Sequence, residues 1–140
     1  MNDLVTFLRD RLAEDEQAAL AASWDEWDGS HWTARHREQR DGRWVIIDRA
    51  DEGVTDVTPQ AADDGAVARH IARQDPARVL REVEAKRRIM DWHIGQRNDK
   101  TPWGEPVVIC FCGYDLPCAT LRLLALPYTD HPDYRDAWRP

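Results

Sequence analysis

All three cysteines of this 140-residue chain lie within nine residues, in the stretch "VVICFCGYDLPCATLRL". Thiolate sulfur and imidazole nitrogen are the usual ligands of structural zinc, which binds four of them tetrahedrally. Cys110 and Cys112 are expected to point to the same side, because side chains alternate along a strand. Gly113 then permits a sharp turn. Cys118 is expected in the first turn of the following helix, where free N–H groups favour a thiolate.

The fourth ligand must come from another part of the chain, and His93 is the best candidate. It lies three residues after Met90, on the expected inward edge of a long helix, and it precedes the loop that leads to the cysteines. His70 is the reserve candidate, and Asp115 is a weaker one. The sequence therefore predicts a zinc site with four ligands: His93, Cys110, Cys112 and Cys118.

The spacing of the cysteines leaves other interpretations open. Zinc sites usually contain the pattern Cys-x-x-Cys, whereas this chain has Cys-x-Cys, so one of these two thiols could be a bystander. Free cysteines that are buried as small apolar side chains fit the sequence equally well. A nucleophilic Cys118 beside His93 or His131 is a third, weaker interpretation, because no motif of a cysteine enzyme surrounds it.

Two amphipathic helical regions are predicted to support this site. Residues 2–23 have an apolar stripe at helical spacing. Residues 63–97 form the second region, with a break at Asp75-Pro76 and a stop at Gly95. The apolar positions are Leu4, Phe7, Leu8, Leu12 and Leu20 in the first region, and Val79, Leu80, Val83, Met90 and Ile94 in the second.

Residues 24–59 are rich in tryptophan and are predicted to form a small antiparallel sheet. Asp41-Gly42 lies between two strand-like stretches and indicates a hairpin. Trp32 and Trp44 are expected either to pair across this hairpin or to reach the core. A nearby group is expected to form a solvated loop and not a metal or acid–base site: Asp25, Glu26, Asp28 and His31.

The C-terminal third is predicted to begin with a loop over 98–107 that leads into a short strand, "VVIC". A final helix is expected to begin near Pro117 and to end at Pro127. Tyr134 and Trp138 are expected to fold back onto the body. We therefore predict one α+β domain over residues 1–140: an N-terminal helix, a small Trp-rich antiparallel sheet, a long central helix, a short strand and a C-terminal helix.

The composition excludes several classes of function. The net charge of −7 disfavours general binding to nucleic acids or membrane surfaces. The arginines of the central helix alternate with glutamates, which predicts ion pairs rather than a basic groove. No apolar run approaches the roughly 20 residues that span a membrane, and the first residues do not resemble a signal peptide. Three cysteines without such a signal predict a cytoplasmic protein with reduced thiols.

Three stretches of the chain resemble DUF6221, a family of small uncharacterised proteins from actinobacteria and their phages: "NDLVTFLRDRLAEDEQAA", "HIARQDPARVLREVEAKRRIMDWH" and "PCATLRLLALPYTDHPDYRDAWRP". The resemblance covers both helical regions and the C-terminal third. It implies no activity, because none is assigned to the family. It does imply a close cysteine pair before the "PC-x-TLR" string and a histidine that ends the long helix, similar to Cys110, Cys112, Cys118 and His93.

These observations favour a non-enzymatic binding or regulatory module, in which zinc only holds the C-terminal third together. The expected partner is a protein, with neither nucleic acid nor membrane. The alternative is a small metal- or cysteine-dependent enzyme of the hydrolase type. Such an enzyme would need an open coordination position on the metal or an activated thiol at Cys118.

Overall fold

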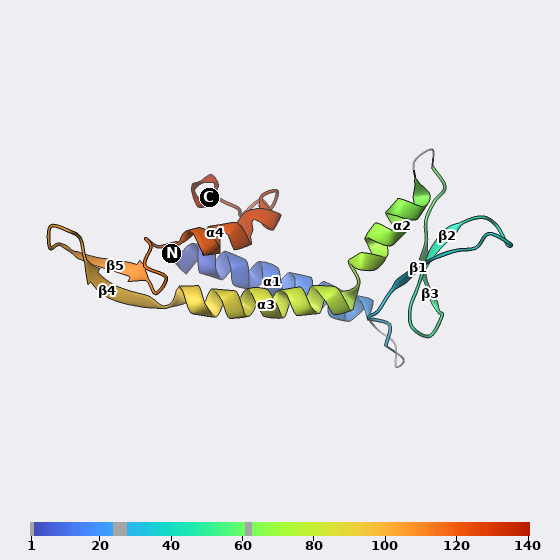
Figure 1. Ribbon diagram of the computed structural model, residues 1–140, viewed down its shortest axis with the longest axis horizontal. Helices are drawn as coiled ribbons and strands as arrows, with labels where there is room; N and C mark the ends of the chain where they lie inside the picture. Colours follow the sequence, from blue (N-terminus) through green and yellow to red (C-terminus); the bar gives the residue numbers. More distant parts are fainter. Residues whose placement is uncertain (1, 24–27, 61–62) are drawn as a thin grey trace. The chain divides into compact units, whose positions relative to one another are not determined.

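The computed structural model describes residues 2–23, 28–60 and 63–140 (Figure 1). Contacts within the chain divide it into two compact units. Unit 1 consists of Met1–Glu14 and Val83–Pro140, and unit 2 consists of Asp15–Glu82. Two helices, α1 (Asn2–Ala22) and α3 (Pro76–Ile94), contribute residues to both units. The mixture of helices and antiparallel strands confirms the predicted α+β class.

Unit 2 contains the predicted small antiparallel sheet. Its strands are β1 (Thr33–His36), β2 (Trp44–Ile47) and β3 (Gly53–Asp56), hydrogen-bonded in that order, and helix α2 (Asp64–Arg73) packs on β1 and β2. Sheet and helix share one small core: Ile46, Val57, Ala68 and Ala72. Full burial of a side chain as large as those of Ile46 and Val57 contributes about 1.5–3 kcal/mol to stability.

The two described tryptophans of this segment pack against that core. The strand register pairs Trp44 with His36, and the two rings stack with centroids 4.9 Å apart. The alternative in which Trp32 and Trp44 pair across the hairpin is therefore wrong, and the alternative in which they reach the core is confirmed. A Cβ at Gly65 would lie 2.9 Å from the Trp44 ring, so α2 needs glycine here to approach β2.

Part of the expected acidic loop can be compared with the structure. Asp25 and Glu26 lie outside the described residues, as do Trp24 and Trp27. The described members, Asp28 and His31, lie between α1 and β1 and contact each other, with 2.9 Å between a carboxylate oxygen and Nδ1.

The predicted helical region 63–97 forms two helices separated by Gln74 and Asp75, as expected from the Asp-Pro pair. A carboxylate oxygen of Asp75 accepts the backbone N–H of Arg78 at 2.8 Å and caps α3. Helix α3 ends at Ile94, directly before Gly95, which also confirms the prediction. The ion pairs expected along this helix include Arg78–Glu82 and Arg88–Glu84, each at 2.7 Å.

Unit 1 is built around the first half of α1 and the last half of α3. The predicted apolar stripe of α1 is buried at four positions, each at most 5% exposed: Leu4, Phe7, Leu8 and Leu12. Leu20, which we also expected to be buried, is 56% exposed and belongs to unit 2. The C-terminal tail folds onto Phe7 as predicted, with ring centroids 5.1 Å from Trp138 and 6.1 Å from Tyr134.

The C-terminal helix is shorter than the sequence indicates. Helix α4 (Ala119–Ala125) begins after Cys118 and gives way to a 3₁₀ helix, η1 (Leu126–Tyr128), which contains Pro127. A second 3₁₀ helix, η2 (Asp136–Trp138), lies in the tail. Among the described residues, we found no helix whose length and apolar character would let it cross a bilayer.

The predicted strand "VVIC" is one half of a hairpin. Strand β5 (Pro106–Cys110) pairs antiparallel with β4 (Gln96–Lys100), which includes part of the stretch expected to be a loop. Every residue of β4 is exposed and polar, so its sequence carries no apolar alternation that would reveal a strand. Pairing with the backbone of β5 determines its conformation instead.

Candidate metal centre

Four soft donor groups meet where the elements of unit 1 end. His93 lies in the last turn of α3, Cys110 is the last residue of β5, Cys112 lies in the turn that follows, and Cys118 is the N-cap of α4. Their potential ligand atoms all lie within 4.8 Å of one another. The structure thus brings together the four residues that the sequence singles out.

The distances between donor atoms suit a tetrahedral ion. His93 Nδ1 lies 3.4 Å from the Sγ of Cys118 and 3.6 Å from the Sγ of Cys110. Zinc bonds of about 2.3 Å to sulfur and about 2.0 Å to nitrogen place tetrahedral S and N ligands about 3.5 Å apart. The side of the ring that faces the sulfurs carries Nδ1, so Nδ1 is the nitrogen that could bind a metal.

The backbone holds the first two cysteines in a tight turn. The N–H of Gly113 donates to the carbonyl of Cys110 at 2.8 Å, and the N–H of Cys110 donates to the carbonyl of Tyr114 at 2.9 Å. Gly113 has φ of +89°, a left-handed conformation that side chains disfavour, so the predicted role of this glycine is confirmed. The N–H of Cys112 points at the sulfur of Cys110, 3.4 Å away.

A contact between Gly95 and Phe111 joins this turn to the end of α3. The N–H of Phe111 donates to the carbonyl of Gly95 at 3.2 Å. A Cβ at position 95 would lie 2.1 Å from the Phe111 ring, so only glycine allows the ring to lie against this backbone. Since Phe111 separates Cys110 from Cys112, the contact positions both thiols relative to His93.

The position of Cys118 depends on the loop before α4. Its backbone is extended, with φ of −67° and ψ of 163°, so Cys118 is the N-cap residue that precedes α4. The prediction that it lies in the first turn of the helix is therefore wrong by one position. The Nε–H of Arg122 donates to the carbonyl of Pro117 at 3.0 Å and ties this loop to α4. The carbonyl of Cys118 accepts the N–H of Arg122 at 3.2 Å.

The three thiols differ in exposure and in acidity. Cys110 and Cys118 are buried, at 0% and 2% exposed, whereas Cys112 is exposed. Burial raises the pKa of the Cys110 thiol to about 11. A hydrogen bond from the Cys110 side chain lowers the pKa of Cys112. Cys112 is therefore the thiol of this pair that ionises first in the metal-free chain, and the first that can offer a thiolate to a cation.

The whole chain, residues 1–140, matches the model of DUF6221, described as a family of unknown function. The chain belongs to this family. No curated protein and no solved structure matched the chain. The function of this DUF6221 member must therefore be inferred from its own side chains.

The other histidine and acidic candidates of this DUF6221 chain lie outside the cluster. His70 is an exposed residue of α2, in unit 2. Asp115 forms an isolated bridge with Ile109, which closes the cysteine turn against β5, but it is not among the four clustered donors. His131, the other proposed partner of Cys118, has its Nδ1 3.1 Å from a guanidinium nitrogen of Arg11.

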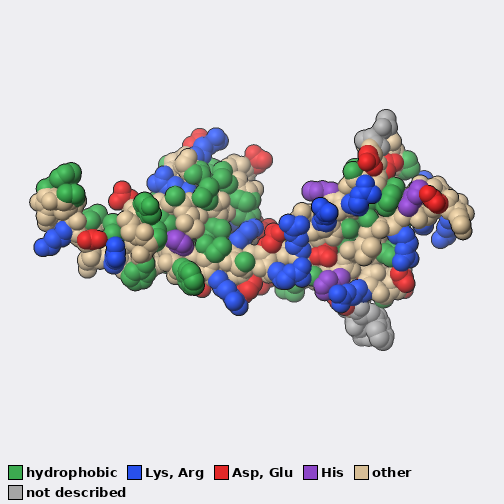
Figure 2. All heavy atoms as spheres, in the orientation of Figure 1, with side chains coloured by type: hydrophobic (Ala, Val, Ile, Leu, Met, Phe, Trp, Pro, Cys, Tyr) green, Lys and Arg blue, Asp and Glu red, His purple; other side chains and the backbone are tan. Residues whose placement is uncertain are grey.

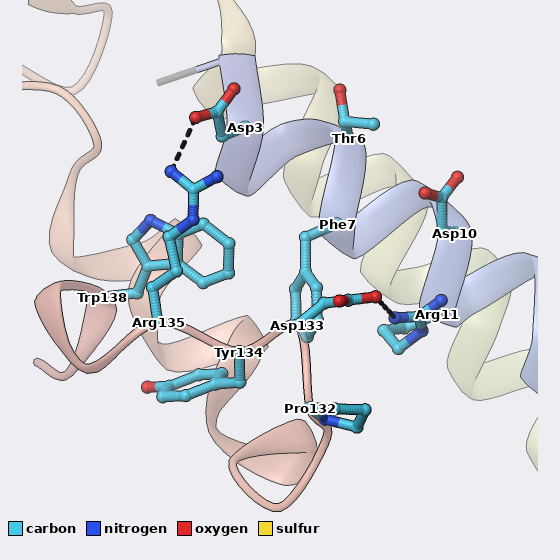
Figure 3. Close-up of a pocket in the computed structure, with 10 residues that line it drawn as sticks. All are labelled: Asp3, Thr6, Phe7, Asp10, Arg11, Pro132, Asp133, Tyr134, Arg135 and Trp138. Carbon is cyan, nitrogen blue, oxygen red and sulfur yellow. Dashed lines mark hydrogen bonds and ion pairs between the residues drawn. The ribbon is translucent and has the colours of Figure 1, made fainter.

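A cleft of about 490 Å³ between α1 and the C-terminal tail is the second candidate site in unit 1 (Figure 3). Ion pairs join its two walls: Arg135 lies 2.7 Å from Asp3, and Arg11 lies 4.0 Å from Asp133. The buried Arg11 also pairs with Glu14 at 2.7 Å. Both guanidinium groups of the cleft are thus already paired within the chain, and this arrangement fixes the tail to α1.

Apart from Gly113, the sequence does not reveal the groups that position the ligands. The contact between Gly95 and Phe111 joins residues from either side of a hairpin whose first strand carries no strand pattern. From the sequence, Gly95 indicates only a helix stop. A glycine directly after a helix is fully explained as a helix stop. Its contact with Phe111 becomes visible only when β4 and β5 are paired.

Proposed function

We propose that this chain is a non-enzymatic binding module in which one zinc ion joins the end of α3, hairpin β4–β5 and the start of α4. The ligands would be His93, Cys110, Cys112 and Cys118. The observation that carries this proposal is the convergence of these four donors within 4.8 Å. One histidine and three cysteines are a common ligand set of structural zinc. When bound, zinc would supply a cross-link between the three segments.

The hairpin has little other stabilisation, which supports a structural role for the ion. All five residues of β4 are exposed, and only Ile109 and Cys110 are buried in β5. A two-stranded hairpin with so small a core is marginally stable by itself. Coordination by the two cysteines at its end would therefore contribute much of the free energy that keeps it folded.

The hydrolase alternative is less well supported by the same geometry. Four protein ligands would fill the tetrahedral shell of zinc, whereas catalytic zinc keeps one position for water or substrate. The thiol version needs an activated thiol at Cys118 that a substrate can reach, but this residue is 2% exposed. We therefore propose no catalytic residue.

Exposed aromatic side chains near the hairpin support a protein as the binding partner. Trp103, in the loop between β4 and β5, is 78% exposed, and Tyr114, after the cysteines, is 70% exposed. Figure 2 shows hydrophobic side chains on the surface where hairpin β4–β5 lies. Strand β4 contributes both basic and acidic residues, so this surface has no uniform positive charge that would favour a polyanion.

The proposed centre needs its three cysteines as reduced thiolates, because thiolate sulfur is the zinc ligand. We propose the cytoplasm, where thiols stay reduced and able to bind zinc.

A DNA column tests the class of partner. A purified chain that the column does not retain would support a protein partner over a nucleic acid. Retention that weakens steadily as salt is raised would contradict a protein partner.

Elemental analysis tests the proposed centre. The chain is purified without added metal, its zinc content is measured, and its thermal unfolding is followed with and without a chelator. We expect one zinc per chain and a lower melting temperature in chelator. A metal-free chain that does not take up added zinc, and whose melting does not respond to chelator, would contradict the proposal.

A further inference from the structure

The four ligand candidates of the metal centre differ in their exposure to solvent. Cys110 and Cys118 are almost completely buried, and His93 is partly buried. Cys112 alone among the four ligand candidates is exposed, because it lies in the tight turn beyond the end of β5. A reagent in solvent therefore meets the sulfur of Cys112 before it can reach the other two sulfurs.

We propose that Cys112 is a site of oxidation by hydroperoxides and that its modification releases the metal from the centre. This inference rests on the proposed function, since it assumes that the four residues bind zinc. Thiolate character and exposure together determine which cysteines are oxidised. Cys112 combines exposure with two further sulfurs within 4.8 Å, which are placed to react with an oxidised neighbour.

The first step is a two-electron oxidation. The Cys112 sulfur attacks one oxygen of hydrogen peroxide, an S–O bond forms, and the O–O bond breaks. The sulfur is oxidised to a sulfenic acid, and the peroxide is reduced to hydroxide, which takes up a proton to become water. The centre has then lost one of its four thiolate or imidazole ligands.

The second step uses a neighbouring thiolate, from Cys110 or Cys118. Its sulfur attacks the sulfenic sulfur of Cys112, an S–S bond forms, the S–O bond breaks, and hydroxide leaves. In total, two thiolates, one peroxide and two protons give one disulfide and two water molecules, once the second hydroxide has also taken up a proton. Only His93 and one cysteine then remain as ligands, too few to hold structural zinc.

The consequence is a hairpin whose stability depends on the redox conditions. Reduction of the disulfide by a thiol reductant regenerates both ligands, so the loss of metal is reversible. Hairpin β4–β5 and its exposed Trp103 would be ordered in the reduced, metal-bound chain and loosened in the oxidised chain.

The experiment uses the full chain loaded with zinc. Hydrogen peroxide is added below one equivalent together with dimedone, which traps sulfenic acids, while a chromophoric chelator reports released zinc. All three cysteines lie in one tryptic peptide, residues 101–122, so fragment-ion spectra are needed to locate the adduct. A matched variant, Cys112→Asp, keeps an oxygen ligand at this position but removes the oxidisable sulfur.

We expect adducts at Cys112 about tenfold more often than at Cys110 or Cys118, because only Cys112 is exposed. Peroxide should release zinc from Cys112→Asp about tenfold more slowly than from the unchanged chain, each relative to its release without peroxide. Two results would overturn this inference alone. One is dimedone adducts spread equally over the three cysteines of the zinc-loaded chain, and the other is equal rates of zinc release from the unchanged chain and Cys112→Asp. A chain that binds no zinc at all would overturn the proposed function as well.

Discussion

The Nδ1 atom of His93 lies 3.4 Å from the sulfur of Cys118, although 25 positions separate the two residues in the sequence. A whole β-hairpin lies between them along the chain. The end of α3 and the start of α4 are therefore held together at one point, and Cys110 reaches the same point from the end of β5. This convergence is the basis of the zinc-binding proposal.

Replacement of a buried cysteine should remove zinc and destabilise the chain. For Cys118→Ser we expect a loss of about 3 kcal/mol at saturating zinc, which lowers the melting temperature by about 10 °C. Calorimetry with and without chelator measures the effect. In chelator, the variant and the unchanged chain should melt within a few degrees of each other, because the chelator has already removed the metal. A difference of the same size in both conditions would indicate a packing effect and contradict the prediction.

The imidazole of His93 should be needed for zinc binding, and that of His70 should not. In His93→Asn, an amide oxygen or nitrogen replaces Nδ1 at nearly the same place, but an uncharged amide is a poor zinc ligand. We expect zinc affinity to fall at least about 100-fold in competition titrations with a chromophoric chelator. His70→Asn is the control, since His70 is exposed in unit 2. Equal affinities in the two variants would exclude His93 as a ligand.

Gly95→Ala should weaken zinc binding, although residue 95 is not a ligand. Its new Cβ would lie 2.1 Å from the Phe111 ring, so the ring would have to leave its place against the end of α3 and the turn would lose this contact. We expect about a tenfold loss of zinc affinity, the lower end of what a misplaced supporting group costs. Phe111→Ala should rescue the loss in the double variant, because it removes the clashing ring. Additive losses in the double variant would show that the Gly95–Phe111 contact does not position the cysteines.

Asp28 in unit 2 provides a prediction about pH. A hydrogen bond from the Ser30 hydroxyl, followed by one from His31, lowers the pKa of its carboxyl group to about 2. Because the folded-state pKa lies below the ordinary value, the contribution to stability is complete above pH of about 4 and is lost as the pH falls through about 2. The NMR titration of the Asp28 carboxyl carbon should have its midpoint near 2. A midpoint near the ordinary 3.8 would show that these hydrogen bonds do not persist in solution.

The sequence was sufficient to predict the helices and the four clustered residues, for physical reasons. The helices have apolar stripes with the period of an α-helix, and the break at Asp75 combines an N-cap with a proline. The cysteines and His93 were recognisable because few residue types can bind zinc. Their meeting point could be anticipated only as a hypothesis, since it depends on how the chain returns from α3 to α4.

Other features could not be predicted because they depend on tertiary contacts. Strand β4 is entirely polar and takes its conformation from pairing with β5. Leu20 continues the helical spacing of the apolar stripe but is exposed, so the spacing alone does not show which positions are buried. Exposure of Cys112 and burial of Cys118 follow from the turn geometry, which the spacing of the cysteines alone does not determine.

X-ray absorption spectroscopy of the zinc-loaded chain tests the central claim most directly, because it reports the ligand atoms around the ion. We predict a four-coordinate shell with three sulfur atoms at about 2.3 Å and one imidazole nitrogen at about 2.0 Å. A shell dominated by oxygen, or one with two or fewer sulfur atoms, would contradict the His93, Cys110, Cys112 and Cys118 centre.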